Sequence, residues 1–170
     1  MRSIAIFVLF AGSLLAQQPT DYQRAMQLGV RALATRNYDE AVAAFQRAVD
    51  LAPTEIGPRV NLAAALMRQY DPGSTSAANL AIANRCHLEF RRAFDLDPNN
   101  WTIPVSIGVL LFGEASGAAD RRAGVRLLEE SREWYRKALA IDPQSRDYWS
   151  WMVRDAWSRW YTDYNGPLFK

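Results

Sequence analysis

The chain alternates between stretches in which apolar residues recur every three or four positions and short polar stretches rich in Pro, Gly or Asn. That spacing places apolar side chains on one face of a helix, whereas the alternating apolar and polar pattern of strands does not occur. Three similar phrases, AVDLAP, AFDLDP and ALAIDP, each end a helical stretch, because proline stops a helix. We therefore predict an all-α protein with almost no strand.

The three phrases recur at a fixed distance. Their prolines, Pro53, Pro98 and Pro143, are 45 residues apart each time (98 − 53 and 143 − 98). A fixed period of this length is typical of a stacked repeat protein, in which each unit buries its apolar face against its neighbours. The period divides the chain into units at 22–55, 56–100 and 101–145, with an unfinished fourth unit at 146–164.

The second and third units are each 45 residues long, eleven more than the 34 of the first. The extra residues lie between the two helices of each unit, where Pro72-Gly73-Ser74 and Ser116-Gly117 interrupt the helical pattern. After these breaks, residues 76–96 and 119–141 have the pattern of unusually long second helices. Eleven residues are close to three helical turns, so the added part keeps the same face inward. The pattern predicts two long helices that stand side by side and extend past the regular stack.

The first unit carries a recognisable set of positions. They are Leu28 and Gly29 in its first helix, and Ala41, Phe45, Ala48 and Pro53 in and after its second. This spacing resembles the tetratricopeptide repeat, a helix–turn–helix unit, although Ala25 and Ala32 stand where the family has Trp and Tyr. Helical HEAT-type repeats also suit the longer period, but the Ala-x3-Phe-x2-Ala phrase favours the tetratricopeptide family. The resemblance implies an α–α superhelix of about three units followed by a capping helix.

The stretch YWSWMVRDAWSRWY, residues 148–161, holds four of the chain's six tryptophans. In the repeat register it belongs to the first helix of the fourth unit, 146–164, which we predict to be the capping helix. Trp149 and Trp160 share one face of that helix and are expected to pack on the long helix before it. Trp151 falls on the opposite face beside Arg154, so capping does not explain it. Residues 165–170 are predicted to be a short tail.

The N-terminus has the pattern of a signal peptide. Arg2 precedes an apolar run that ends at Ala16, a small residue, and a polar stretch follows. The run is shorter than the roughly 20 apolar residues that a membrane-spanning helix needs. The alternative is a first core helix, but the run has no polar face. We predict a signal peptide at 1–16, a short tail at 17–21, and export to the periplasm or the extracellular space.

Composition excludes several classes of function. The net charge of +2 and the lack of a basic cluster give no reason to expect nucleic-acid binding. Cys86 is the single cysteine, so it forms no internal disulfide, and we expect it to be a small buried packing residue. The single histidine, His87, is its neighbour, but adjacent residues of a helix point about 100° apart, and the two make no zinc site. We expect a non-catalytic protein without a cofactor.

The family resemblance also implies where a partner binds, because tetratricopeptide arrays usually hold peptides on a concave face lined by first helices. The positions that map onto this face are mostly apolar: Gln23, Met26, Val30, Leu33, Val60, Asn61, Ala64, Met67, Val105, Val109 and Phe112. The basic residues with which some family members grip a peptide carboxylate are missing. We expect the groove to accept an amphipathic helix or apolar segment of another protein, with Trp151 and Arg154 near its end.

Two alternatives stay open. In the first, the long second helices, the N-terminal tail or another copy of the chain covers the groove. In the second, the protein works at a membrane surface or handles lipid, using its apolar helices and the C-terminal tryptophans. Liposome binding that survives removal of residues 1–16 would distinguish this second function from that of a protein-binding scaffold.

Overall fold

The computed structural model describes residues 19–145. They form six α-helices and a short 3-10 turn at Pro143–Ser145; the helices are α1 (Asp21–Ala34), α2 (Tyr38–Leu51), α3 (Ile56–Met67), α4 (Ala77–Leu96), α5 (Thr102–Ala115) and α6 (Arg121–Ile141). No strand occurs in this range, and the predicted all-α class is confirmed. The predicted signal peptide at 1–16 and the predicted capping helix at 146–164 lie outside the described residues.

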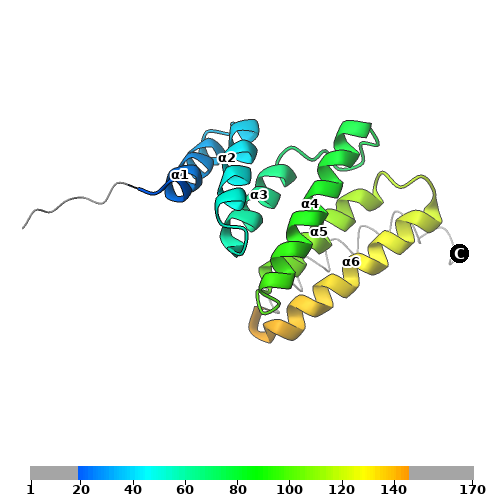
Figure 1. The fold of residues 1–170 in the computed structure, drawn as a ribbon. Helices are drawn as coiled ribbons and strands as arrows, with labels where there is room; N and C mark the ends of the chain where they lie inside the picture. The colour runs from blue at the N-terminus through cyan, green and yellow to red at the C-terminus, as the bar shows by residue number, and fades with distance from the viewer. Residues whose placement is uncertain (1–18, 146–170) are drawn as a thin grey trace, which may run out of the picture.

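The helices pack as three successive pairs. Contacts are most extensive within α1–α2, α3–α4 and α5–α6, and the pairs are joined through α2–α3 and α4–α5. Figure 1 shows the pairs following one another across the molecule from α1 to α6. This arrangement is the stack of helix–turn–helix units that the repeat pattern predicts. Within residues 19–145, no helix is both long enough and apolar enough to cross a membrane.

Side-chain caps explain where several helices begin. At the start of α1, the Thr20 hydroxyl accepts a hydrogen bond from the Gln23 backbone N–H (3.2 Å), and the Gln23 side chain accepts one from the Thr20 backbone N–H (2.8 Å). This reciprocal pair satisfies two backbone donors that the helix itself leaves free. Ser76 caps α4 and Asp120 caps α6 by accepting from a backbone N–H in the first turn. The Asp120 cap starts α6 at Arg121, slightly later than the pattern predicts.

The main core runs between the paired helices, where Phe45, Leu62, Phe90 and Ile107 are almost completely buried. In the first pair, α1 and α2 approach each other very closely at Gly29. A Cβ atom there would lie 2.5 Å from a ring carbon of Phe45. Only glycine therefore allows the ring from α2 to lie directly against the backbone of α1.

The long second helices are confirmed, since α4 has 20 residues and α6 has 21, against 14 in α2. The loops that precede them touch each other. A Cβ atom on Gly117 would lie 2.8 Å from the backbone oxygen of Gly73. Gly73 has a φ of +89°, a conformation that residues with a side chain rarely adopt. The inserted residues thus form two loops in backbone contact and two extended helices.

Candidate functional site

The first helices of the three pairs carry the residues that the sequence assigns to a binding groove. Val30 on α1 is 55% exposed. Ala64 on α3 and Val109 on α5 hold the equivalent positions and are half-buried. Around them Met26, Leu33, Val60 and Met67 are half-buried and pack on the main core. We call these seven residues, together with Asn61 and Phe112, the first-helix face. Val30 is exposed and the other eight are half-buried, so all of them keep some accessible surface.

Val105 does not belong to an accessible groove, and its assignment is wrong. It is 4% exposed and packs with Tyr135 and Ala138 in a second, smaller cluster. The reason lies in α5 itself, whose sequence TIPVSIGVLLFGEA is apolar on nearly all sides. A helix of this kind is buried between its neighbours, so mapping by repeat position overestimates what it exposes. On α5 the accessible part of the first-helix face is limited to Val109 and Phe112, both half-buried.

Asn61 is the one amide among the half-buried positions of the first-helix face. Within residues 19–145 its side chain makes no hydrogen bond. An asparagine side chain can donate two hydrogen bonds and accept two, so it offers free hydrogen-bonding capacity in an apolar setting. None of the face positions carries a charge. The face can therefore recognise an apolar segment and one polar backbone or side-chain group, but has no cation for a carboxylate.

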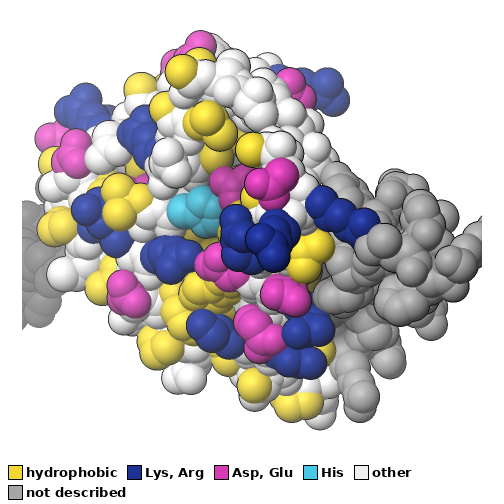
Figure 2. Space-filling view, turned by 90° about the vertical axis from the view of Figure 1, so that its right-hand side faces the viewer, with side chains coloured by type: hydrophobic (Ala, Val, Ile, Leu, Met, Phe, Trp, Pro, Cys, Tyr) yellow, Lys and Arg dark blue, Asp and Glu magenta, His cyan; other side chains and the backbone are white. Residues whose placement is uncertain are grey.

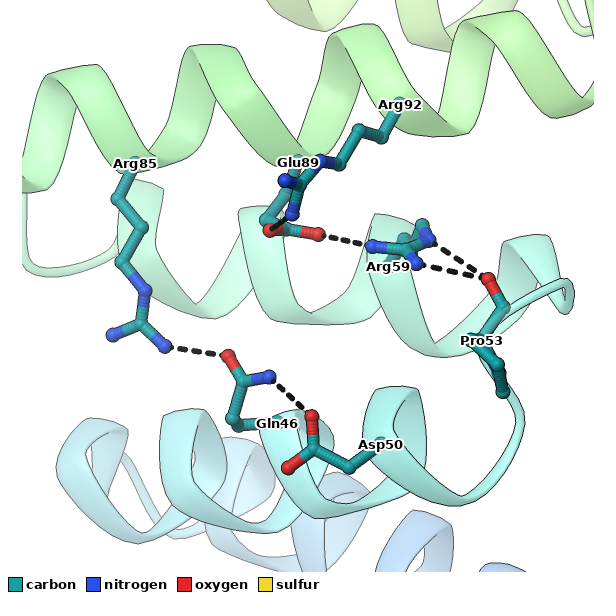
Figure 3. Close-up of polar contacts among 7 residues, drawn as sticks. All are labelled: Gln46, Asp50, Pro53, Arg59, Arg85, Glu89 and Arg92. Carbon is teal, nitrogen blue, oxygen red and sulfur yellow. Dashed lines mark hydrogen bonds and ion pairs between the residues drawn. The ribbon is translucent and has the colours of Figure 1, made fainter.

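Behind the first-helix face, a polar network fixes α3 between α2 and α4 (Figure 3). The Arg59 guanidinium donates to the backbone oxygen of Pro53, at 2.8 and 3.3 Å, and to the Glu89 carboxylate at 2.9 Å. Glu89 also pairs with Arg92 at 3.2 Å. The side chains of Arg59 and Glu89 are only 12% and 6% exposed, so this is a largely buried ion pair.

A separate group of polar contacts joins the second helices of the first two units. Arg85 on α4 donates to the Gln46 side-chain oxygen on α2 at 2.7 Å, and the Gln46 nitrogen donates to Asp50 at 2.9 Å (Figure 3). The bonds from Arg85 to Gln46 and from Arg59 to Pro53 join the second unit to the first. Sequence reasoning missed the network because its partners lie 30 to 39 residues apart and no local motif marks them.

Cys86 and His87 make different hydrogen-bond contacts, and their helical spacing predicts that they point in different directions. Cys86 is fully buried and its Sγ lies 3.8 Å from the backbone oxygen of Ala63. Burial, with a smaller contribution from the nearby Glu114 carboxylate, raises the pKa of the Cys86 thiol to about 12, which keeps it protonated and unreactive. His87 instead reaches α5, where its Nε2 lies 3.0 Å from a carboxylate oxygen of Glu114. The prediction that Cys86 is a packing residue is confirmed.

Within the described chain, no group of three or more His, Cys, Asp and Glu side chains is arranged to hold a metal ion. Trp151 and Arg154, which we placed near the end of the groove, lie outside the described residues. The candidate site is therefore the first-helix face of α1 and α3 with its narrow continuation on α5. Its composition suits binding, since apolar side chains, one free amide and no activated nucleophile are present on it.

Comparison with known proteins identifies residues 22–55 as a match to the tetratricopeptide repeat family. Among solved structures, the chain is similar to the TPR2B domain of yeast Sti1 in its complex with pHsp70, with a TM-score of 0.56 and 16% sequence identity. The likeness covers 82% of this chain and 98% of that chain, so the shared fold extends well beyond the first unit. No curated protein matches the chain. The first unit, residues 22–55, therefore matches the tetratricopeptide repeat family, and the chain has a fold similar to that of a tetratricopeptide domain.

Proposed function

We propose that this protein is a non-catalytic scaffold that binds an apolar peptide or amphipathic helix of another protein on its first-helix face. The observation that carries the proposal is the accessibility of Val30, which is 55% exposed among the half-buried Met26 and Val60. Apolar side chains in that number on one accessible face are typical of an interaction site. A tetratricopeptide fold suggests a protein–protein interaction module, and the Sti1 domain to which the chain is similar is in a complex with pHsp70.

We expect the partner to differ from a peptide that is bound through its C-terminal carboxylate. The face positions carry no Lys or Arg, so the favourable contacts are apolar burial and the hydrogen bonds that Asn61 has free. Each apolar side chain that the partner buries contributes roughly 1.5–3 kcal/mol before the cost of association. A segment with two or three apolar anchors on one helical face is the simplest partner of this kind.

The proposal includes an exported setting. It rests on the signal-peptide pattern of residues 1–16, and it places the scaffold in the cell envelope or the secreted space after cleavage near Ala16. Mass spectrometry of the protein purified from a bacterial periplasm should find Gln17 as the N-terminal residue. Recovery of the uncleaved chain from the cytoplasm alone would contradict this part of the proposal.

A fluorescence titration with an apolar probe tests the binding face. The purified protein should bind the probe saturably, and Val30→Asp should weaken binding several-fold, because it places a charge at the most exposed apolar position of the face. Leu51→Asp is the matched control, since Leu51 is a 47% exposed aliphatic residue at the end of a second helix. Equal binding by both variants, or none by the unmodified protein, would remove the support for an open face.

The alternative function, at a membrane surface, is decided by a parallel measurement. Flotation with neutral and anionic liposomes should leave the protein unbound once residues 1–16 are removed. Liposome binding that depends on the C-terminal tryptophans, together with no effect of Val30→Asp on any protein contact, would favour the lipid-associated function instead.

A further inference from the structure

The sulfur-containing side chains of residues 19–145 fall into two groups. Cys86 is 0% exposed, and burial raises the pKa of its thiol to about 12, so little of the thiolate that reacts with oxidants forms. Only the neighbouring histidine, His87, reaches the surface there, in the view of Figure 2. Met26 and Met67 are the two methionines of this range, and both are half-buried members of the first-helix face. The accessible sulfur of these residues therefore lies on the proposed binding face.

The two methionines lie beside the most accessible apolar positions of the face, one on each of its first two helices. Met26 precedes Val30 by four residues on α1, and Met67 follows Ala64 by three residues on α3. Residues at these spacings are neighbours on the surface of a helix. A partner segment that lies across Val30 and Ala64 therefore has a methionine beside it on α1 and another on α3.

The buried core does not contain methionine. Among residues 19–145, none of the fully buried apolar side chains is a methionine. The repeat-equivalent positions of the face hold no sulfur either, since Val60 corresponds to Met26 and Leu33 corresponds to Met67. An oxidant of methionine therefore acts on two positions of the face and on no fully buried residue of this range.

We propose that Met26 and Met67 are oxidation sites through which a peroxide reversibly weakens partner binding to the first-helix face. This inference rests on the proposed function of that face. In the reaction, the sulfur lone pair forms a bond to one oxygen of hydrogen peroxide and the O–O bond breaks. The departing hydroxide takes the proton of the transferred oxygen and leaves as water. Sulfur loses two electrons and the peroxide gains them, so the thioether becomes a sulfoxide.

The sulfoxide weakens binding because it is polar. Oxidation turns a flexible apolar side chain into one with a strong hydrogen-bond acceptor. An apolar partner that covers this oxygen removes it from water without offering a hydrogen bond in return, which is unfavourable. Methionine sulfoxide reductases restore the thioether, so binding recovers when the sulfoxides are reduced.

Peroxide treatment of the full chain, stopped with catalase, tests the proposal. Peptide mapping by mass spectrometry should show one added oxygen atom on Met26 and one on Met67. Titration with the apolar fluorescent probe should then give binding about fivefold weaker or more than before treatment. Reductases for both sulfoxide epimers should restore the original affinity. Circular dichroism should show the same helix content before and after oxidation, because no fully buried residue of the described range has been altered.

The double variant Met26→Leu/Met67→Leu is the matched control, since leucine has a similar volume and no sulfur. It keeps Cys86 and Met152, so it should bind the probe like the unmodified protein and should not respond to peroxide. The inference alone is overturned if the two methionines stay unoxidised, if their oxidation leaves affinity unchanged, if it unfolds the helices, or if the double variant loses affinity equally. A protein that does not bind the probe before treatment would refute the proposed function, and this inference with it.

Discussion

Replacing Gly29 by alanine should destabilise the protein, although alanine is the better helix former. The new Cβ atom would lie 2.5 to 2.7 Å from three carbons of the Phe45 ring. Carbon atoms attract one another best at about 3.5–4.0 Å, so this contact is strongly repulsive. The ring has no room to retreat, because Phe45 is 0% exposed and its surroundings are close-packed.

The size of the effect follows from two opposing terms. Alanine in place of glycine inside a helix contributes about 1 kcal/mol in favour of folding. Overpacking a rigid core costs about 1–3 kcal/mol, and the short distance places Gly29 at the upper end. The net loss is about 2 kcal/mol, which should lower the Tm by about 6 °C in a chain of this size. Urea denaturation followed by circular dichroism measures the same free energy independently.

Gly57→Ala is the matched control for this experiment. Gly57 lies in the first turn of α3, and a Cβ atom there would meet nothing within 4 Å. The substitution should therefore stabilise the chain by about 0.5 kcal/mol. The Gly29→Ala loss should also shrink when Phe45 is already replaced by leucine, since the two sites are coupled. A Gly29→Ala variant as stable as the unmodified protein would refute the packing argument.

Three further predictions concern the network, the buried thiol and the C-terminal segment. Glu89→Ala should cost about 2 kcal/mol in urea denaturation, because it leaves the largely buried Arg59 without its carboxylate; an unchanged midpoint would mean that the pair adds nothing. Burial raises the pKa of the Cys86 thiol from 9.0 to about 12, so thiolate formation favours the unfolded chain. The contribution of the thiol to the free energy of unfolding is fully present below pH 9.0 and is lost as the pH rises through about 12. Over that pH range the Tm of the unmodified protein should therefore fall further than the Tm of Cys86→Ala. Trp149→Ala and Trp160→Ala should each cost about 2–3 kcal/mol if the segment caps the array, whereas Trp151→Ala should cost about 0.5 kcal/mol or less; equal melting temperatures for the three variants would contradict the capping assignment.

Local signals in the sequence predict most of the fold. The phrases that end in Pro53, Pro98 and Pro143 mark the ends of α2, α4 and α6, because proline cannot continue a helix. Thr20 with Gln23 predicts the start of α1 for an equally local reason, since a capping box needs only residues within one turn. These features depend on neighbours in the chain, and a single sequence displays them directly.

The candidate site is less predictable, because exposure depends on how the helices pack in three dimensions. Repeat position makes Val105 equivalent to Met26 and Val60, yet those two are half-buried and Val105 is 4% exposed. Val105 packs with Tyr135 and Ala138 of α6, and the repeat pattern alone does not display that contact. The Arg59–Glu89 pair and the His87–Glu114 contact likewise join residues about 30 positions apart, and a common arginine or glutamate gives no local hint of its partner.

The contact between the loops at Gly73 and Gly117 has a consequence for how this protein can change. The two loops belong to different units, yet a backbone atom of one fills the place where a side chain on the other would stand. Shortening one unit to the regular repeat length would withdraw its loop and leave the other without support. We therefore expect the two insertions to be coupled, so that a change in the length of one loop requires a matching change in the other.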